Sequence, residues 1–143
     1  MKVLPLRQRW GAFGQPATPP RQAIATFLTE IVERSLESRL GCLLANAALE
    51  VAPHDPEIAG VVAERMAELE AFFRRCVIAG RQDGSISPDT HPADAARLFV
   101  TTVMGLRVLA RGYPKRALLE GAVRQALSIL GKPAQRPKSP ARV

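Results

Sequence analysis

The apolar residues of this chain recur at intervals of three and four positions, and prolines and glycines divide them into segments. Such spacing places apolar side chains along one face of a helix. It predicts helices over residues 18–38, 42–52, 56–82, 93–111 and 115–130, and residues 2–10 form a further short candidate. The sequence therefore predicts an all-α bundle of about five to six helices.

The segment from Cys42 to Ala52 is unusual because nine of its eleven residues are apolar. A helix that is apolar nearly all round is expected in the interior, packed on several sides. Its two polar residues, Asn46 and Glu50, are four apart and share a face with Cys42. This polar stripe predicts either the wall of a cavity or a core helix whose amide and carboxylate bond to neighbouring helices.

The connections between the segments carry helix-end signals. Asp55 is a good N-cap, Pro56 suits the first helical position, and Glu57 complements the positive end of the helix dipole. Gly84 follows an aspartate in a turn-type sequence, which ends the long third helix. His91 precedes Pro92 and is expected to be a loop residue or a cap.

The last two predicted helices are separated by Gly112-Tyr113-Pro114 and must form an antiparallel hairpin. Their apolar faces are wide enough for more than one partner, which favours pairing with a second copy in a four-helix interface. Gly105, in the middle of the first of them, predicts that something approaches the backbone there. Arg107 and Arg111 are expected to pair with Glu120, to pair with a partner chain, or to face solvent. The predicted dimer residues are Phe99, Val103, Leu106, Leu109, Leu119, Val123, Ala126 and Leu127.

The net charge of +7 suggests nucleic acid until its distribution is considered. Residues 41–131 carry ten basic and ten acidic side chains, so the excess lies at the two ends and marks no phosphate-tracking surface. Residues 132–143 contain three prolines and four basic residues and are expected to be a disordered tail. Residues 1–17 are expected to be a connecting helix remnant and loop, which leaves residues 18–131 as the folded domain.

The remaining sequence signals limit the location and the chemistry. No apolar run reaches the roughly 20 residues that span a bilayer, and the start is too polar for a signal peptide. Two cysteines make no disulfide framework, so a cytoplasmic protein is expected. No nucleophile elbow or phosphate-cradling glycine loop is present, so neither a catalytic residue nor a cofactor is predicted. Cys42, Asn46, Glu50 and His54 are spaced by four, but Pro53 breaks the helix before His54, and no metal site is predicted.

Four stretches together carry a resemblance to a known family: residues 41–50, 53–57, 69–75 and 105–111. They resemble the C-terminal regulatory domain of TetR/AcrR-type transcriptional repressors. The resemblance implies an effector pocket within the bundle and a dimer built by the last two helices. A small apolar effector would bind between helices, because ligand pockets are mostly apolar with a few placed polar groups. The residues expected to bind it are Cys42, Asn46, Glu50, Met66, Leu69, Phe72 and Phe73, although Phe72 and Phe73 also fit a plain core role.

In that family a helix-turn-helix domain precedes the regulatory domain and binds the operator. Only residues 1–17 precede the first predicted regulatory helix, so DNA binding is expected only through a domain that this chain does not contain. The chain is then either a truncated regulator or a stand-alone module that forms heterodimers with a full-length repressor. Cys42, at a helix start, is also a candidate redox or electrophile sensor, with a buried inert thiol as the alternative. Cys76 is expected in the core.

Overall fold

The structure, a computed structural model, describes residues 18–37 and 43–133. Every regular element in these two ranges is helical, which confirms the predicted all-α class. The elements are α2 (Pro20–Glu37), α3 (Leu43–Asn46), the π-helical turn η1 (Ala47–Val51), α4 (Pro56–Asp83), α5 (Pro92–Gly112) and α6 (Arg116–Ser128). The predictions for residues 1–17 and 134–143, and for Cys42, lie outside the described residues.

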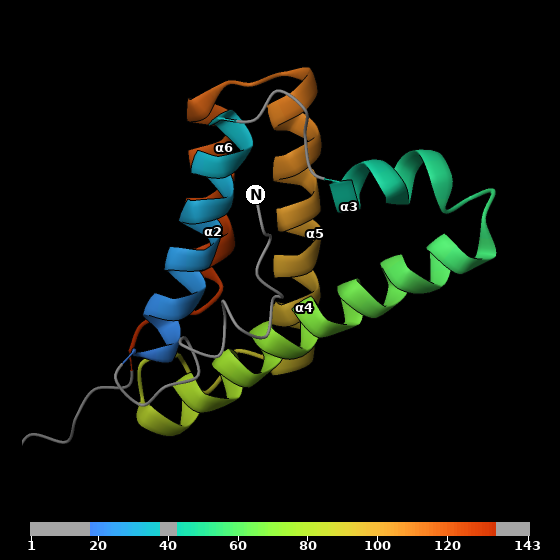
Figure 1. The fold of residues 1–143 in the computed structure, drawn as a ribbon. Helices are drawn as coiled ribbons and strands as arrows, with labels where there is room; N and C mark the ends of the chain where they lie inside the picture. The colour runs from blue at the N-terminus through green and yellow to red at the C-terminus, as the bar shows by residue number, and fades with distance from the viewer. Residues whose placement is uncertain (1–17, 38–42, 134–143) are drawn as a thin grey trace, which may run out of the picture.

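Helices α2, α5 and α6 run side by side as one bundle, and α4 crosses one end of it (Figure 1). The C-terminal half of α4 packs on α2 and α5, whereas its N-terminal half extends away from the bundle toward η1. Helix α6 returns antiparallel to α5 and also contacts α2, so the predicted hairpin of the last two helices is confirmed. The main core therefore lies between α2, α4 and α5, and α6 closes one side of it.

The predicted helix ends are confirmed by their hydrogen bonds. The Asp55 carboxylate accepts bonds from the backbone N–H groups of Glu57 (3.0 Å) and Ile58 (3.2 Å), as an N-cap residue should. His91 caps α5, because its Nδ1 accepts a bond from the backbone N–H of Asp94 at 3.3 Å. Helix α4 ends at Gly84, whose φ of 81° lies in the left-handed region that glycine adopts without strain.

Arg21, near the start of α2, joins three segments that are distant in sequence. Its guanidinium donates to the carbonyl oxygens of Ser85 (3.1 Å) and Gly131 (2.7 Å). The Thr90 hydroxyl adds a bond to the carbonyl of Ile129 at 3.0 Å. These donors bind carbonyls just beyond the end of α6 and fix the α4–α5 connection against it.

The expectation that residues 42–52 form a central buried helix is wrong for its described part, residues 43–52. The segment is short and peripheral, and η1 contributes no buried residue. The Leu49 side chain is 63% exposed, whereas Ala45 of α3 is buried; among the described helices, α3 contacts mainly α5 and η1 contacts mainly α4. Its second half is a π-turn, in which the N–H of Ala52 donates to the carbonyl of Ala47 at 2.8 Å. This wider turn removes the four-residue stacking expected for an α-helix.

Within the described residues, no helix combines the length and the apolar character that a membrane span requires.

Candidate functional site

The predicted effector residues lie on two separate parts of the fold. Asn46 is half-buried on α3, and Glu50 is exposed on η1. The Asn46 side-chain oxygen accepts a hydrogen bond from the Arg111 guanidinium at 2.5 Å, which ties α3 to the last turn of α5. Of the alternatives stated for Arg111, pairing with Glu120 is not observed, because Glu120 accepts a hydrogen bond from Arg116 and the exposed Arg111 bonds to Asn46. The described residues contain no cluster of three or more side chains suited to hold a metal ion.

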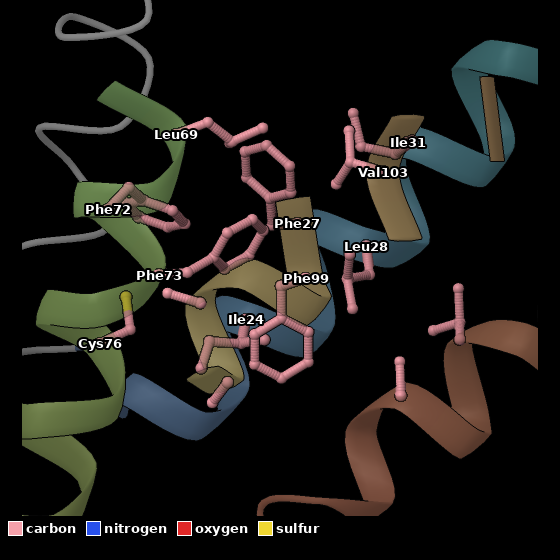
Figure 2. Close-up of a cluster of buried hydrophobic side chains, with 14 of the residues drawn as sticks. Ile24, Phe27, Leu28, Ile31, Leu69, Phe72, Phe73, Cys76, Phe99 and Val103 are labelled. Atoms are coloured by element: carbon pink, nitrogen blue, oxygen red, sulfur yellow. The ribbon is translucent and has the colours of Figure 1, made fainter. Parts of the chain in front are cut away.

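The α4 members of the predicted effector set, except Met66, are core residues. Leu69, Phe72 and Phe73 are buried, whereas Met66 is half-buried. Phe73 points into a cluster of rings that includes Phe27 of α2 and Phe99 of α5 (Figure 2). The centroid of its ring lies 5.2 Å from that of Phe27, 5.4 Å from that of Phe72 and 5.2 Å from that of Phe99.

These distances are typical of favourable aromatic pairs, so the rings fill the space between one another. The structure thus places Leu69, Phe72 and Phe73 in the packed core, on a different part of the fold from Asn46 and Glu50. An effector site on this set stays a prediction. The contribution of Phe27 and Phe99 to this cluster was missed, although both lie on apolar stripes that the sequence shows.

Cys76 occupies the apolar face of α4, as expected, and is buried beside this core (Figure 2). Burial raises the pKa of its thiol to about 11, against a reference value of 9.0. Since the thiolate is the nucleophile, a thiol with such a pKa is unreactive near neutral pH. The unfolded chain ionises first as pH rises above 9, so this residue lowers stability progressively between pH 9 and 11, and the loss persists at higher pH.

We expect Cys76 to resist iodoacetamide in the folded protein at pH 8. A Cys42→Ser variant leaves Cys76 as the single thiol of the chain. Mass spectrometry should find it unmodified under native conditions and fully modified in guanidinium chloride. Rapid native labelling of this variant would show that α4 opens readily and would contradict the packing described above.

Most residues of the predicted dimer set face the interior of their own protomer. Six are buried against α2, α4 or the other hairpin helix: Phe99, Val103, Leu106, Leu119, Val123 and Ala126. A side chain already buried has no surface left to bury against a second copy. Leu127 is half-buried, and only Leu109 is clearly exposed, at 38%. The dimer itself remains a prediction, but these six side chains cannot supply its surface.

One exposed side of the hairpin is rich in apolar and small residues, and we call it the hairpin face. Helix α5 contributes Leu98, Thr101, Thr102, Gly105, Val108, Leu109 and Gly112, and helix α6 contributes Leu118, Gly121, Ala122, Gln125 and Ile129. Intervals of three and four place each set on one side of its helix. The sequence contains this second stripe, but it was not predicted as an interface because the apolar stripe beside it is stronger.

Two details make the hairpin face suited to close helix packing. The hydroxyls of Thr101 and Thr102 donate to the carbonyls of Arg97 (2.9 Å) and Leu98 (2.8 Å), so their donors are satisfied within α5. A Cβ added at Gly105 would meet nothing within 4 Å. Among residues 18–37 and 43–133, no group makes the approach to the Gly105 backbone that the sequence predicts.

A shallow groove of about 280 Å³ separates α2 from α6, on a different side of α6 from the hairpin face. Val32, Val123 and Leu127 supply its apolar lining, and Thr29 and Arg124 lie beside them. Glu33 and Glu120 complete the lining, and both accept hydrogen bonds from Arg116. The bond from Arg116 lowers the pKa of the Glu33 carboxyl. We call this feature the α2–α6 groove.

Comparisons with known proteins agree with this architecture. Residues 19–126 match the family described as the tetracyclin repressor-like, C-terminal domain. The chain is 27% identical over 113 residues to the uncharacterized HTH-type transcriptional regulator YezE of Bacillus subtilis (strain 168). That match covers 77% of this chain, and the chain spans 58% of the length of YezE.

A solved structure extends the comparison to three dimensions. It contains a cysteine mutant of the TetR family transcriptional regulator CifR complexed with 26-bp double-strand operator DNA. The similarity has a TM-score of 0.68 and 27% identity, and it covers 85% of this chain and 67% of that chain. The match over most of the helical domain and the shared fold lead to one assignment: the chain belongs to the TetR family of transcriptional regulators, and residues 19–126 are its C-terminal domain.

Proposed function

We propose that two copies of this domain pair through their hairpin faces and serve as the dimerisation and effector-sensing part of a TetR-type regulator. The observation that carries the proposal is the hairpin face itself. It exposes five large apolar side chains (Leu98, Val108, Leu109, Leu118 and Ile129), and Gly105 meets no side chain of the described residues. A symmetric pair would bury the same patch from both copies in a four-helix arrangement.

Four charged side chains of the two hairpin helices turn toward other helices, which supports this choice of face. On α5, Arg97 contacts Glu70 of α4 at 3.6 Å and Arg111 bonds to Asn46 of α3. On α6, Arg116 and Glu120 turn toward α2. Charges are depleted in the centres of protein interfaces because their desolvation is costly, so the mainly apolar hairpin face fits a partner better than the charged sides.

Leu109→Glu is expected to raise the dimer dissociation constant at least about tenfold, since it would place a carboxylate from each copy in the same interface. Light scattering across micromolar concentrations measures the effect, with circular dichroism to confirm the fold. Leu49→Glu is the matched control, because Leu49 is more exposed than Leu109 and lies on η1. A wild-type chain that stays monomeric at every concentration, or a Leu109→Glu variant that dimerises normally, would contradict the proposal.

The effector part of the proposal rests on the link between α3 and α5. A small apolar molecule bound beside Asn46, Glu50 and Met66 would compete with the Asn46–Arg111 hydrogen bond. Loss of that bond would free the last turn of α5, which leads directly into α6. Effector binding and the geometry of the dimer would then be coupled through one helix. In a regulator that carries a helix-turn-helix domain, this change would alter the spacing of the two DNA-binding heads.

The same hairpin face would accept the matching hairpin of a full-length relative. Mixing the purified chain with such a repressor and measuring operator binding tests this second role. Loss of operator binding that depends on the intact hairpin face would support heterodimer formation. The Leu109→Glu variant is the control for that dependence.

A further inference from the structure

We infer that the side of α4 opposite the core is a second self-association surface, on which two copies of this chain pair as antiparallel helices. Helix α4 crosses one end of the bundle, and its core side carries Leu69, Phe73 and Cys76 (Figures 1 and 2). The opposite side shares no residue with the hairpin face. The inference therefore does not rest on the proposed dimer, and it adds a contact by which two such dimers would join.

The opposite side of α4 carries one stripe of residues at alternating intervals of three and four positions. We call it the α4 seam, and it consists of Glu57, Gly60, Glu64, Ala67, Ala71, Arg74, Ile78 and Arg81. Ala71 is half-buried and the other seven residues are exposed. Such alternation, continued along a helix, is the spacing of a coiled-coil seam. At 1.5 Å per residue the seam is about 36 Å long, which is enough for an extended helix pair.

The charges of the seam have opposite signs in its two halves. Its N-terminal half carries Glu57 and Glu64, and its C-terminal half carries Arg74 and Arg81. In an antiparallel pair centred on position 69, residues at equal distances from that position meet. This register places Glu57 of one copy opposite Arg81 of the other, and it likewise places Glu64 opposite Arg74. Twofold symmetry repeats both contacts, whereas a parallel pair would bring like charges together.

The uncharged residues of the seam fit the same register. Ala67 meets Ala71 near the centre, where small side chains allow the two helix axes to approach closely. Ile78, whose side chain is 39% exposed, meets Gly60 of the other copy. A Cβ added at Gly60 would meet nothing within 4 Å, so this position has room for the isoleucine. Charge and shape therefore select the same partner, a second copy of α4.

The four seam charges are available for contacts between copies. None of them forms an ion pair or a side-chain hydrogen bond with a residue in the ranges 18–37 and 43–133. Charges beside the seam on the same helix are paired within the protomer. Arg65 contacts Glu68 at 3.1 Å, and Glu70 contacts Arg97 of α5 at 3.6 Å.

The helix dipole accounts for only part of this charge pattern. Carboxylates are favourable in the first turn of a helix and cations in the last turn, which suits Glu57 and Arg81. The dipole effect falls off beyond these turns. Glu64 and Arg74 lie further inside α4, so the dipole gives no reason for their signs. Pairing between copies explains all four charges.

The expected association is weak and sensitive to salt. Exposed ion pairs contribute little individually, and the small residues at the centre bury little apolar surface. Salt screens charges that remain in contact with water. We therefore expect the α4 seams to pair at higher protein concentrations than the hairpin faces, and sodium chloride to weaken the pairing.

Sedimentation velocity of the Leu109→Glu chain tests the inference, because this background removes pairing through the hairpin face. A concentration-dependent dimer is expected. Glu64→Arg and Arg74→Glu, each added to this background, should raise the dissociation constant about tenfold or more, since like charges then meet twice. An equimolar mixture of the two variants should associate as the parent does. One chain then carries arginine at positions 64 and 74 and the other carries glutamate at both, so every contact joins opposite charges.

Arg65→Glu is the matched control, because it reverses an exposed charge of α4 that lies off the seam. It should leave the association unchanged, and circular dichroism confirms that each variant keeps its helical content. A parent chain that stays monomeric at every concentration, or a mixture that associates no better than its components, would overturn the inference. If Leu109→Glu leaves the hairpin dimer intact, the same pattern appears as tetramers that each variant loses and the mixture restores. Failure of the hairpin dimer and failure of the α4 seam are thus seen separately.

Discussion

Phe73→Ala is expected to lower the free energy of unfolding by about 3–5 kcal/mol, the loss found when a large buried ring is truncated. Phe73 is fully buried and its ring contacts those of Phe27, Phe72 and Phe99, from three different helices. Removal of the ring leaves a cavity among rigid neighbours that cannot collapse into it. The same substitution also removes the favourable edge-to-face contact with Phe27, whose ring plane lies at 73° to that of Phe73.

Urea unfolding followed by circular dichroism measures this loss, at one protein concentration for all variants because dimerisation adds to apparent stability. Phe73→Leu should cost clearly less, since it keeps most of the buried apolar volume. Leu49→Ala should change stability by no more than about 0.5 kcal/mol, because that side chain is largely exposed. A loss below about 1 kcal/mol for Phe73→Ala would show that the ring cluster is loosely packed.

Gly80→Ala is expected to destabilise the domain by about 2 kcal/mol, although alanine is the better helix former. Gly80 lies in the last turns of α4, and a Cβ added there would stand 2.3 Å from Cδ1 of Ile86 and 2.5 Å from its Cγ1. Ile86 is fully buried, so its side chain has no free space to move into. The overpacking cost therefore exceeds the gain of up to about 1 kcal/mol in helix propensity.

Gly60→Ala provides the matched control in the same helix. An added Cβ at Gly60 meets nothing within 4 Å, so this variant should gain up to about 1 kcal/mol. Combining Gly80→Ala with Ile86→Val should restore part of the loss, because the valine lacks the Cδ1 methyl that lies nearest the new Cβ. Equal effects of alanine at Gly80 and Gly60, or strictly additive effects in the double variant, would mean that Ile86 does not limit position 80.

The amino-acid sequence alone determined the helices and their ends. Asp55 was expected as a cap and His91 as a loop residue or a cap; both form capping hydrogen bonds, and the turn at Gly84 ends α4 as predicted. These features are local, since they depend on residues within a few positions of each other. The resemblance to TetR-type regulators was also visible at this level, because it rests on short stretches in a fixed order.

The use of each helix face was decided by the tertiary structure. The strongest apolar stripes of the last two helices, which include Val103 and Val123, were expected to meet a second copy but pack inside the protomer. Periodicity identifies an apolar face without identifying the element that covers it. Here α2, about 70 residues earlier in the chain, reaches both hairpin helices and takes those stripes into its own core. On the described hairpin helices, the weaker stripe around Gly105 stays exposed.

The segment from Leu43 to Val51 shows the same limit in the opposite direction. Its composition predicted burial on several sides, yet the fold supplies neighbours on only part of its surface and leaves Leu49 exposed. The α2–α6 groove has no local sequence signal at all, because Val32 and Arg124 meet only when the chain has folded. Local hydrogen bonds and helix periodicity are properties of the sequence, whereas burial and site geometry arise from contacts between distant elements.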